Sequence, residues 1–285
     1  MSTGSHEFVR ATPRPGGPIV SAVGYRTRGV PPALHRGLPS PYLTVIFTLD
    51  GPVVGGHTPE QATGPGATRT DVVVGGLHQR PAYIAQSGSE AGIQLAVHPL
   101  AARALLGVPA AALAGPVAIE GTDVLGRSAA HVREELAGLD DWRARFDLLA
   151  AYLTPDEDPL TGVRHEVAEA WTWLARHRGA GTLRGLAAHV ALSERRLTTL
   201  FRAETGLAPK QAARLMRFQH AKAAVVRSVA SGAPPDLARV AAEHGYCDHS
   251  HLVRDFHQYT GLSPTGWLAE ECRNIQAGGH HNGED

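Results

Sequence analysis

The chain has 285 residues, 43% of them hydrophobic and 19% charged, and its 27 basic and 27 acidic side chains cancel. This length allows two domains with separate cores, and the composition is that of a soluble globular protein. Two cysteines, Cys247 and Cys272, are too few for a disulfide framework and fit a reducing cytoplasm. No apolar run follows a basic start, and the apolar stretch 93–113 contains charged residues and prolines, so neither a secretion signal nor a membrane span is expected.

The N-terminal half predicts a β-rich domain. Residues 1–20 are rich in Gly, Pro and Ser, which predicts a disordered N-terminus. Short runs rich in β-branched and aromatic residues then alternate with Gly and Pro, a pattern typical of a small β-barrel or sandwich. The predicted strands are 42–49, 71–74, 82–86 and 93–97.

Helices are predicted after Pro99. Residues 100–106 form a short amphipathic stretch with Gly107 as its end. Two longer helices are expected at 122–137 and 141–152, with Thr122 and Asp140 as caps. We therefore expect a first domain at residues 21–154 and, from its Pro and acidic content, a linker at 155–162.

The segment after the linker contains a repeat. Ser193-Glu194-Arg195-Arg196-Leu197 runs on to Gly206 and Pro209, and 55 residues later Asp248-His249-Ser250-His251-Leu252 runs on to Gly261 and Pro264. Each copy has a helix, a tight turn, a capping residue and a second amphipathic helix ended by glycine, so each predicts a helix-turn-helix. Such a unit places its second helix in a DNA major groove.

The helix between the two copies sets their spacing. It is expected over residues 210–229, stopped by Pro234-Pro235, and about 20 residues correspond to about 30 Å. Successive major grooves on one DNA face lie about 34 Å apart, so one chain could read both. Residues 163–275 also carry 15 basic and 10 acidic side chains, whereas residues 1–162 carry 12 and 15. This basic excess fits a polyanionic partner, although a solvated surface also explains it.

These residues resemble the AraC/XylS family of bacterial transcription regulators. The resemblance covers about residues 163–269 and is strongest in the second copy, where a fixed spacing joins Ala241, Gly245, Tyr246, Asp248, Ser250, Leu252, Phe256, Gly261 and Pro264. It implies an α+β multidomain protein, with a cupin-like sensory β-domain and its helices, then an all-helical DNA-binding domain at 163–275 and a disordered tail at 276–285. The sequence departs from the family at Ala191, where a turn glycine is common, and at Leu252, where an aromatic residue is common.

The resemblance also implies the DNA contacts. Residues after each cap enter the major groove, and the corresponding base-contacting candidates here are Arg195, Thr198, Thr199, His249, Ser250, Val253 and Arg254. The candidate phosphate contacts are Arg196, Arg202 and Arg217. An arginine in the groove can hold guanine through two hydrogen bonds, while an exposed helix arginine without a ligand is the alternative for each.

No enzymatic function is expected, because the sequence shows no phosphate-binding loop, serine elbow or catalytic triad. The histidines fall into two groups without the spacing of a closed metal site, so no metal and no cofactor are expected. We expect double-stranded DNA as partner, with a small-molecule effector, RNA polymerase and a second copy of the chain as further candidates, and a cytoplasmic, nucleoid-associated location. Two alternatives remain open: a cupin-like metalloenzyme with an appended DNA-binding module, and a regulator whose N-terminal half only dimerises through its helices.

Overall fold

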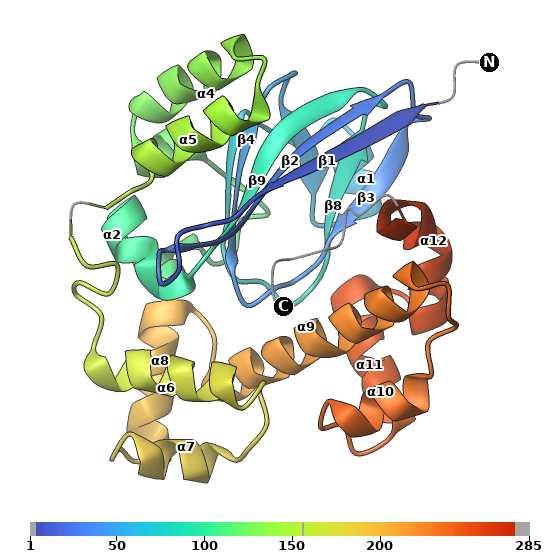
Figure 1. Ribbon diagram of the computed structural model, residues 1–285. Coiled ribbons are helices and arrows are strands. Elements are labelled where there is room, and N and C mark those ends of the chain that lie inside the picture. Colours follow the sequence, from blue (N-terminus) through green and yellow to red (C-terminus); the bar gives the residue numbers. More distant parts are fainter. Residues whose placement is uncertain (1–3, 156, 277–285) are drawn as a thin grey trace. The chain divides into compact units, whose positions relative to one another are not determined.

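The computed structural model describes residues 4–155 and 157–276, with side chains described as far as Glu271 (Figure 1). The chain divides into two compact units, whose main boundary along the chain falls between Gly162 and Val163. We use the name N-terminal unit for the part up to Gly162 and C-terminal unit for the part from Val163. The predicted tail lies outside the described residues apart from Gln276, which ends the last helix.

The N-terminal unit is built on two antiparallel sheets (Figure 1). The larger sheet has the strand order β1-β2-β9-β4-β7-β10, and the smaller has the order β3-β8-β5-β6. The strands of the larger sheet are β1 (Ser5–Ala11), β2 (Ile19–Arg28), β4 (Leu43–Thr48), β7 (Val72–Gly75), β9 (Glu90–Val97) and β10 (Ile119–Glu120). Those of the smaller sheet are β3 (Ala33–Gly37), β5 (Val53–Gly56), β6 (Thr68–Thr70) and β8 (Ala82–Gln86).

The core of this unit lies at the centre of the larger sheet. Phe47, Val74 and Ile93 come from β4, β7 and β9 and are fully shielded from solvent. These strands consist mainly of β-branched and aromatic residues, which pack well on a pleated surface. All four strands expected from the sequence are present, with ends shifted by a few residues.

The N-terminal segment corrects one prediction. Residues 5–11 form β1 and pair with β2 from Ser5↔Arg28 to Ala11↔Ala22. The Gly and Pro content of residues 1–20 predicts disorder here. Phe8 and Val9 are half-buried there. The backbone hydrogen bonds of an edge strand depend on a long-range partner, which local composition does not reveal.

Helices complete the N-terminal unit. They are α1 (Pro59–Thr63), the 3₁₀ turns Pro99–Ala101 and Ala110–Leu113, α2 (Ala102–Leu106), α3 (Gly121–Leu125), α4 (Ser128–Gly138) and α5 (Trp142–Tyr152). The single helix expected at 122–137 is wrong, because Gly126 adopts a left-handed φ of 76° and separates α3 from α4. The cap of α5 is Asp141 rather than Asp140, and its carboxylate accepts the Ala144 N–H at 2.8 Å.

Trp142 fastens α5 to the sheet. Its ring lies against Gly24 of β2 so closely that a Cβ there would come within 2.5 Å of the indole. Its Nε1 donates to Glu7 of β1 at 3.0 Å, and the guanidinium groups of Arg26 and Arg145 lie 5.2 and 4.7 Å from the ring centroid. Glycine at position 24 is therefore required by close packing rather than by backbone freedom.

The C-terminal unit is entirely helical among its described residues. Its helices are α6 (His165–Arg176), α7 (Leu183–His189), α8 (Glu194–Thr205), α9 (Pro209–Ala230), α10 (Leu237–Glu243), α11 (His249–Thr260) and α12 (Pro264–Gln276). Within this unit, α9 runs from the α7–α8 pair to the α10–α11 pair (Figure 1). The predicted fold, a β-rich part followed by an all-helical helix-turn-helix part, is confirmed.

Candidate nucleic-acid interface

The first helix-turn-helix consists of α7 and α8. Thr182 caps α7 by accepting the Gly185 N–H at 3.0 Å, and Ser193 caps α8 by accepting the Arg196 N–H at 3.2 Å. Gly206 ends α8 in a left-handed conformation, with φ of 80°. Leu197 and Phe201 are fully buried, and the Phe201 ring stacks 5.8 Å from Trp171 of α6. One face of α8 is thereby fixed to the core and the opposite face is left to solvent.

The second helix-turn-helix consists of α10 and α11 and repeats this arrangement. Asp236 caps α10 and Asp248 caps α11, each through an N–H three residues later, at 3.0 and 2.7 Å. Leu252 and Phe256 are fully buried, and Gly261 ends the helix with φ of 76°. Phe256 packs edge-on against Phe218 of α9, with ring centroids 5.1 Å apart. We call α8 and α11 the reading helices.

The two turns have the same hydrogen bond and the same backbone form. Leu192 N–H donates to Ala187 O, and Tyr246 N–H donates to Ala241 O, both at 3.0 Å. The residue before each donor is left-handed: Ala191 with φ of 54° and Gly245 with φ of 72°. The repeat seen in the sequence is therefore a structural repeat.

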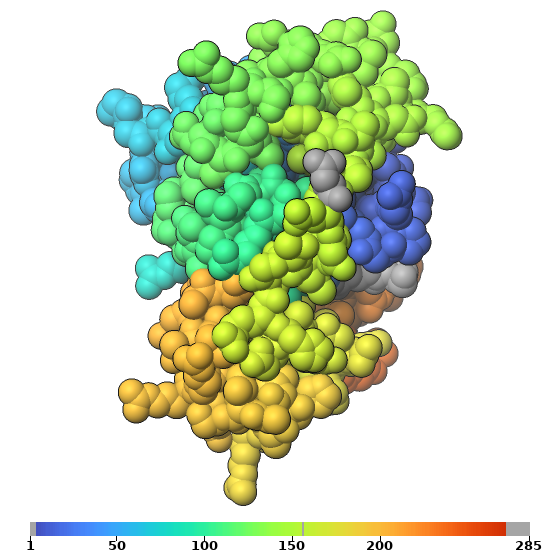
Figure 2. Space-filling model, turned by 90° about the vertical axis from the view of Figure 1, so that its left-hand side faces the viewer, coloured from blue at the N-terminus to red at the C-terminus, as the bar shows by residue number. Residues whose placement is uncertain are grey.

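Most of the predicted DNA contacts lie on exposed surface. Among the base-contacting candidates, Thr198 and Val253 are half-buried and the rest are exposed, namely Arg195, Thr199, His249, Ser250 and Arg254. Arg196 and Arg202 are exposed as well. Figure 2 shows side chains of the segment coloured yellow to orange, which includes α7 and α8, extending from the surface. The exposed face of each reading helix thus carries at least one arginine.

Two side-chain groups on α8 are already engaged by the helix itself. Thr198 Oγ1 donates to Glu194 O at 2.7 Å, and Thr199 Oγ1 donates to Arg195 O at 3.1 Å. A hydroxyl that donates to its own helix keeps its oxygen as an acceptor and its methyl group as an apolar contact. These threonines therefore suit exocyclic amino donors or the thymine methyl better than base acceptors.

Arg217 has a partner inside the protein. Its guanidinium donates to Gly245 O at 3.0 Å and lies 5.6 Å from the centre of the Tyr246 ring. It therefore joins α9 to the turn of the second helix-turn-helix. The predicted phosphate contact of Arg217 stays a prediction.

An ion pair between a half-exposed arginine and a buried aspartate was not predicted from the sequence. Arg214 of α9 donates through Nε to Asp255 Oδ1 of α11 at 2.7 Å, and its Nη2 lies 2.6 Å from the same oxygen. Asp255 is completely buried. Burial alone would lower the pKa of Arg214, but the hydrogen bond and negative charge of Asp255 outweigh it and raise the pKa. The available signal was an aspartate between two apolar residues of the buried stripe, Leu252 and Phe256.

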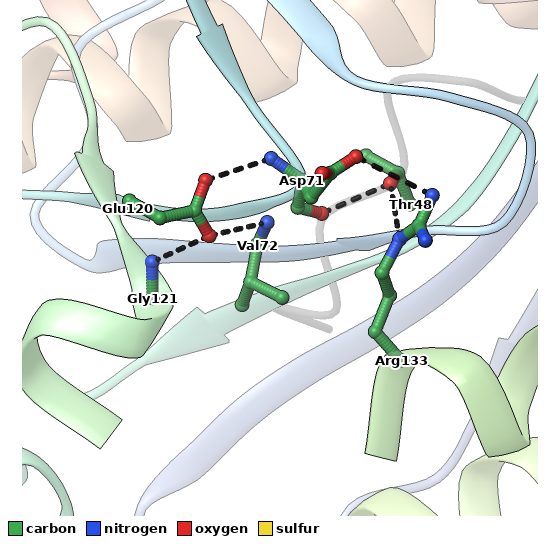
Figure 3. Close-up of polar contacts among 6 residues, drawn as sticks. All are labelled: Thr48, Asp71, Val72, Glu120, Gly121 and Arg133. Atoms are coloured by element: carbon green, nitrogen blue, oxygen red, sulfur yellow. Dashed lines mark hydrogen bonds and ion pairs between the residues drawn. The ribbon is translucent and has the colours of Figure 1, made fainter. Parts of the chain in front are cut away.

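The N-terminal unit contains a cluster of polar contacts around Glu120 and Arg133 (Figure 3). Both residues line an open pocket of about 310 Å³. The Glu120 carboxylate accepts the backbone N–H groups of Asp71, Val72 and Gly121 at 2.9 to 3.0 Å. Arg133 of α4 donates to Thr48 Oγ1 at 3.1 Å and lies 3.4 Å from Asp71. These contacts tie α4 to β4 and the edge strand β10 to the start of β7.

In the part of the chain that the structure describes, no group of three or more His, Cys, Asp or Glu side chains is placed to hold a metal ion. Burial lowers the pKa of His98, which follows β9, to about 4. Its Nδ1 accepts the Leu100 N–H at 3.3 Å, which requires the neutral ring.

No helix among the described residues is long and apolar enough to span a membrane.

Comparison with known proteins identifies the second unit. Residues 186–270 match the family model described as "Helix-turn-helix domain", which spans both helix-turn-helix units. The chain therefore carries a helix-turn-helix domain, the kind of DNA-binding domain that the sequence resemblance predicts. No curated protein matches the chain.

Several solved structures share features of the fold. ToxT from Vibrio cholerae O395 is 10% identical over 87% of this chain and 96% of its own, with a TM-score of 0.48. The C-terminal domain of AraT, a response regulator from Geobacillus stearothermophilus, is 17% identical over 39% and 88%, with a TM-score of 0.34. The AraC-like transcriptional activator CuxR is 15% identical over 80% and 82%, with a TM-score of 0.31. At these values the similarities carry no conclusion about function.

Proposed function

We propose that this protein is a transcription regulator that binds a specific DNA sequence with both reading helices, α8 and α11, in successive major grooves on one face of the duplex. The observation that carries the proposal is the pair of helix-turn-helix units with the same cap and turn hydrogen bonds on one connecting helix. The 22 residues of α9 correspond to a length of about 33 Å. This matches the spacing of about 34 Å between successive major grooves.

Arginines define the expected base contacts. Arg195 is exposed near the N-terminal end of α8, the end that an inserted recognition helix directs to the base edges, and Arg254 is exposed in the middle of α11. Each can donate two hydrogen bonds to guanine. Thr198, Thr199, His249, Ser250 and Val253 supply the further base contacts in this proposal. Arg196 and Arg202, exposed on α8, supply phosphate contacts in this proposal. Arg217 adds a further contact from its guanidinium to the DNA backbone.

The N-terminal unit is proposed to sense a small molecule or a protein partner. A folded β-rich unit with its own core supports a separate task, and an open pocket lined by Glu120 and Arg133 offers polar groups to a ligand. ToxT from Vibrio cholerae has been crystallised with an unsaturated fatty acid bound. For this chain, ligand classes that include fatty acids should be screened for a change in DNA affinity, and a partner role should be tested by sedimentation.

The proposal is tested by selecting DNA from a random pool with the full-length protein and then titrating salt. We expect one enriched sequence with two specified segments, and an affinity that falls steeply with salt because phosphate contacts release counterions. A variant with both Arg195→Ala and Arg254→Ala should bind the selected DNA no better than random DNA. The control is Arg143→Ala on α5, whose side chain is 89% exposed and far from either reading helix in sequence. Equal enrichment by the double variant and the wild type would refute the proposal.

A further inference from the structure

The second reading helix is attached to the connecting helix differently from the first. Asp255 of α11 is fully buried and ion-paired with Arg214 of α9, whereas the residue at the equivalent position of α8, 55 residues earlier, is Leu200. The two helix-turn-helix units are otherwise alike in their caps, their turn bonds and their buried apolar pairs. Leucine at position 200 cannot form an ion pair, so at this position of the reading helix the charged contact with α9 belongs to the second unit.

The ion pair belongs to a larger contact between α9 and the second helix-turn-helix. One turn further along α9, Arg217 donates to Gly245 O in the turn and lies over the Tyr246 ring. Arg214 lies 5.4 Å from the centre of the Tyr259 ring of α11. Two arginines of one helix thus hold the turn and the middle of α11 at the same time.

The energetics argue against a simple stabilising role. Asp255 is removed from water, whereas 34% of the Arg214 side chain is exposed. Burying a charge costs free energy that its partner only partly returns, and an apolar pair of similar volume often stabilises a protein equally well or better. Asp255 Oδ2 and the Tyr246 hydroxyl are both buried. Burial, the negative charge of Asp255 and a hydrogen bond with it raise the pKa of Tyr246, so the phenol stays protonated.

A hydrogen-bonded ion pair favours one relative orientation of the two helices that carry it. Arg214 Nε donates to Asp255 Oδ1 at 2.7 Å, and the direction of this charge-assisted hydrogen bond favours one position of α11 along α9. An apolar contact such as Leu200 has no comparable directional preference. We infer that Arg214 and Asp255 are positioning residues that fix the orientation of α11 on α9, so that recognition of the second half of the DNA site depends on them and recognition of the first half does not.

This inference rests on the proposed function, in which the two reading helices bind two grooves. The experiment distinguishes a failure of the inference from a failure of the proposed function. The readout is discrimination at the α11 half-site: the dissociation constant for DNA with that half scrambled, divided by the constant for the intact selected DNA. Wild-type discrimination is expected to be on the order of tenfold per essential base pair. If the wild type itself shows no discrimination at that half, the proposed function fails, whatever the variants do.

Two variants test the ion pair. Asp255→Asn keeps the shape of the side chain and removes its charge. The double change Arg214→Met and Asp255→Leu replaces the pair with apolar groups and imitates Leu200 of the first unit. The controls make matched changes in the exposed ion pair of α10, Arg239 with Glu243, where the side chains are 61% and 53% exposed: Glu243→Gln and Arg239→Met.

The expected result separates positioning from stability. In both test variants discrimination at the α11 half-site falls close to one, while discrimination at the α8 half-site stays at the wild-type value. The melting temperature of the double variant returns to that of the wild type or exceeds it, since an apolar pair tolerates burial, and yet its discrimination is not restored. Both controls keep full discrimination. Wild-type discrimination at the α11 half-site in either folded test variant would overturn the inference.

Discussion

Replacing Ala191 with glycine should stabilise the C-terminal unit, because Ala191 adopts a backbone conformation that suits glycine. Its φ is 54°, and the equivalent residue in the second turn is Gly245 with φ of 72°. A left-handed conformation costs a residue with a Cβ about 1–2 kcal/mol. The larger unfolded-state entropy of glycine offsets about 0.5–1 kcal/mol of this. The net gain for Ala191→Gly is then about 0.5–1 kcal/mol.

The reverse substitution in the turn of the second helix-turn-helix, Gly245→Ala, should lower the free energy of unfolding. A Cβ at Gly245 would have no neighbour closer than Arg217 Cδ at 3.9 Å, so Gly245→Ala meets no steric clash. Its cost is therefore the backbone term alone, and we expect a loss of about 1 kcal/mol. The two substitutions test the same physical term in the two copies of one motif.

Thermal and urea unfolding of the full chain, followed by circular dichroism at a helix wavelength, measure both effects. For a unit of this size the expected shifts in melting temperature are roughly 2–6 °C, upward for Ala191→Gly and downward for Gly245→Ala. The matched control is Ala188→Gly on the exposed side of α7, which should lower stability by about 1 kcal/mol because its backbone is helical. Destabilisation by Ala191→Gly, equal to that of the control, would refute the reasoning.

Three further predictions follow from named contacts. The N-terminal unit should lose stability as the pH falls from about 6.5 to about 4. The neutral ring of His98 is favoured in the folded state, with a pKa of about 4, so the unfolded chain binds more protons in this window. The loss should be at most about 3 kcal/mol, and unfolding of His98→Asn, which keeps the acceptor, should lack this part of the pH dependence. Gly24→Ala should displace the ring of Trp142, whose atoms lie as close as 2.5 Å to the new Cβ, and cost about 1–3 kcal/mol. Tryptophan fluorescence compared with that of Trp142→Phe measures the displacement, and unchanged emission and stability would contradict it. Arg254→Ala should cost about 1–3 kcal/mol of DNA binding and relax specificity at one position, whereas Arg202→Ala should weaken binding to all sequences alike. Competition binding with single-base variants of the selected DNA distinguishes these patterns, and a uniform loss for Arg254→Ala would show that it does not contact a base.

The helix-turn-helix geometry was largely predictable because its determinants are local. Thr182, Ser193 and Asp248 lie three residues before the N–H groups that they cap, and Gly206 directly follows the helix that it ends. Signals of this range are readable along the sequence. The match of residues 186–270 to the helix-turn-helix model confirms the assignment.

The parts that were not predicted depend on long-range partners. Arg214 and Asp255 are 41 residues apart, so only the fold shows that the charge inside the buried stripe of α11 has a partner on α9. The strand β1 pairs with β2 in a segment whose prolines and glycines suggested disorder. The break between α3 and α4 follows from the left-handed Gly126, which the apolar periodicity of that segment did not reveal.

A footprint of the full-length protein on its selected DNA tests the central claim most directly. Cleavage by hydroxyl radicals should show two protected windows on one face of the duplex, with centres about 10 base pairs apart, since both reading helices are held by one connecting helix of about one DNA turn in length. The Arg195→Ala variant should weaken one window and Arg254→Ala the other. One protected window that both substitutions weaken equally would contradict the account.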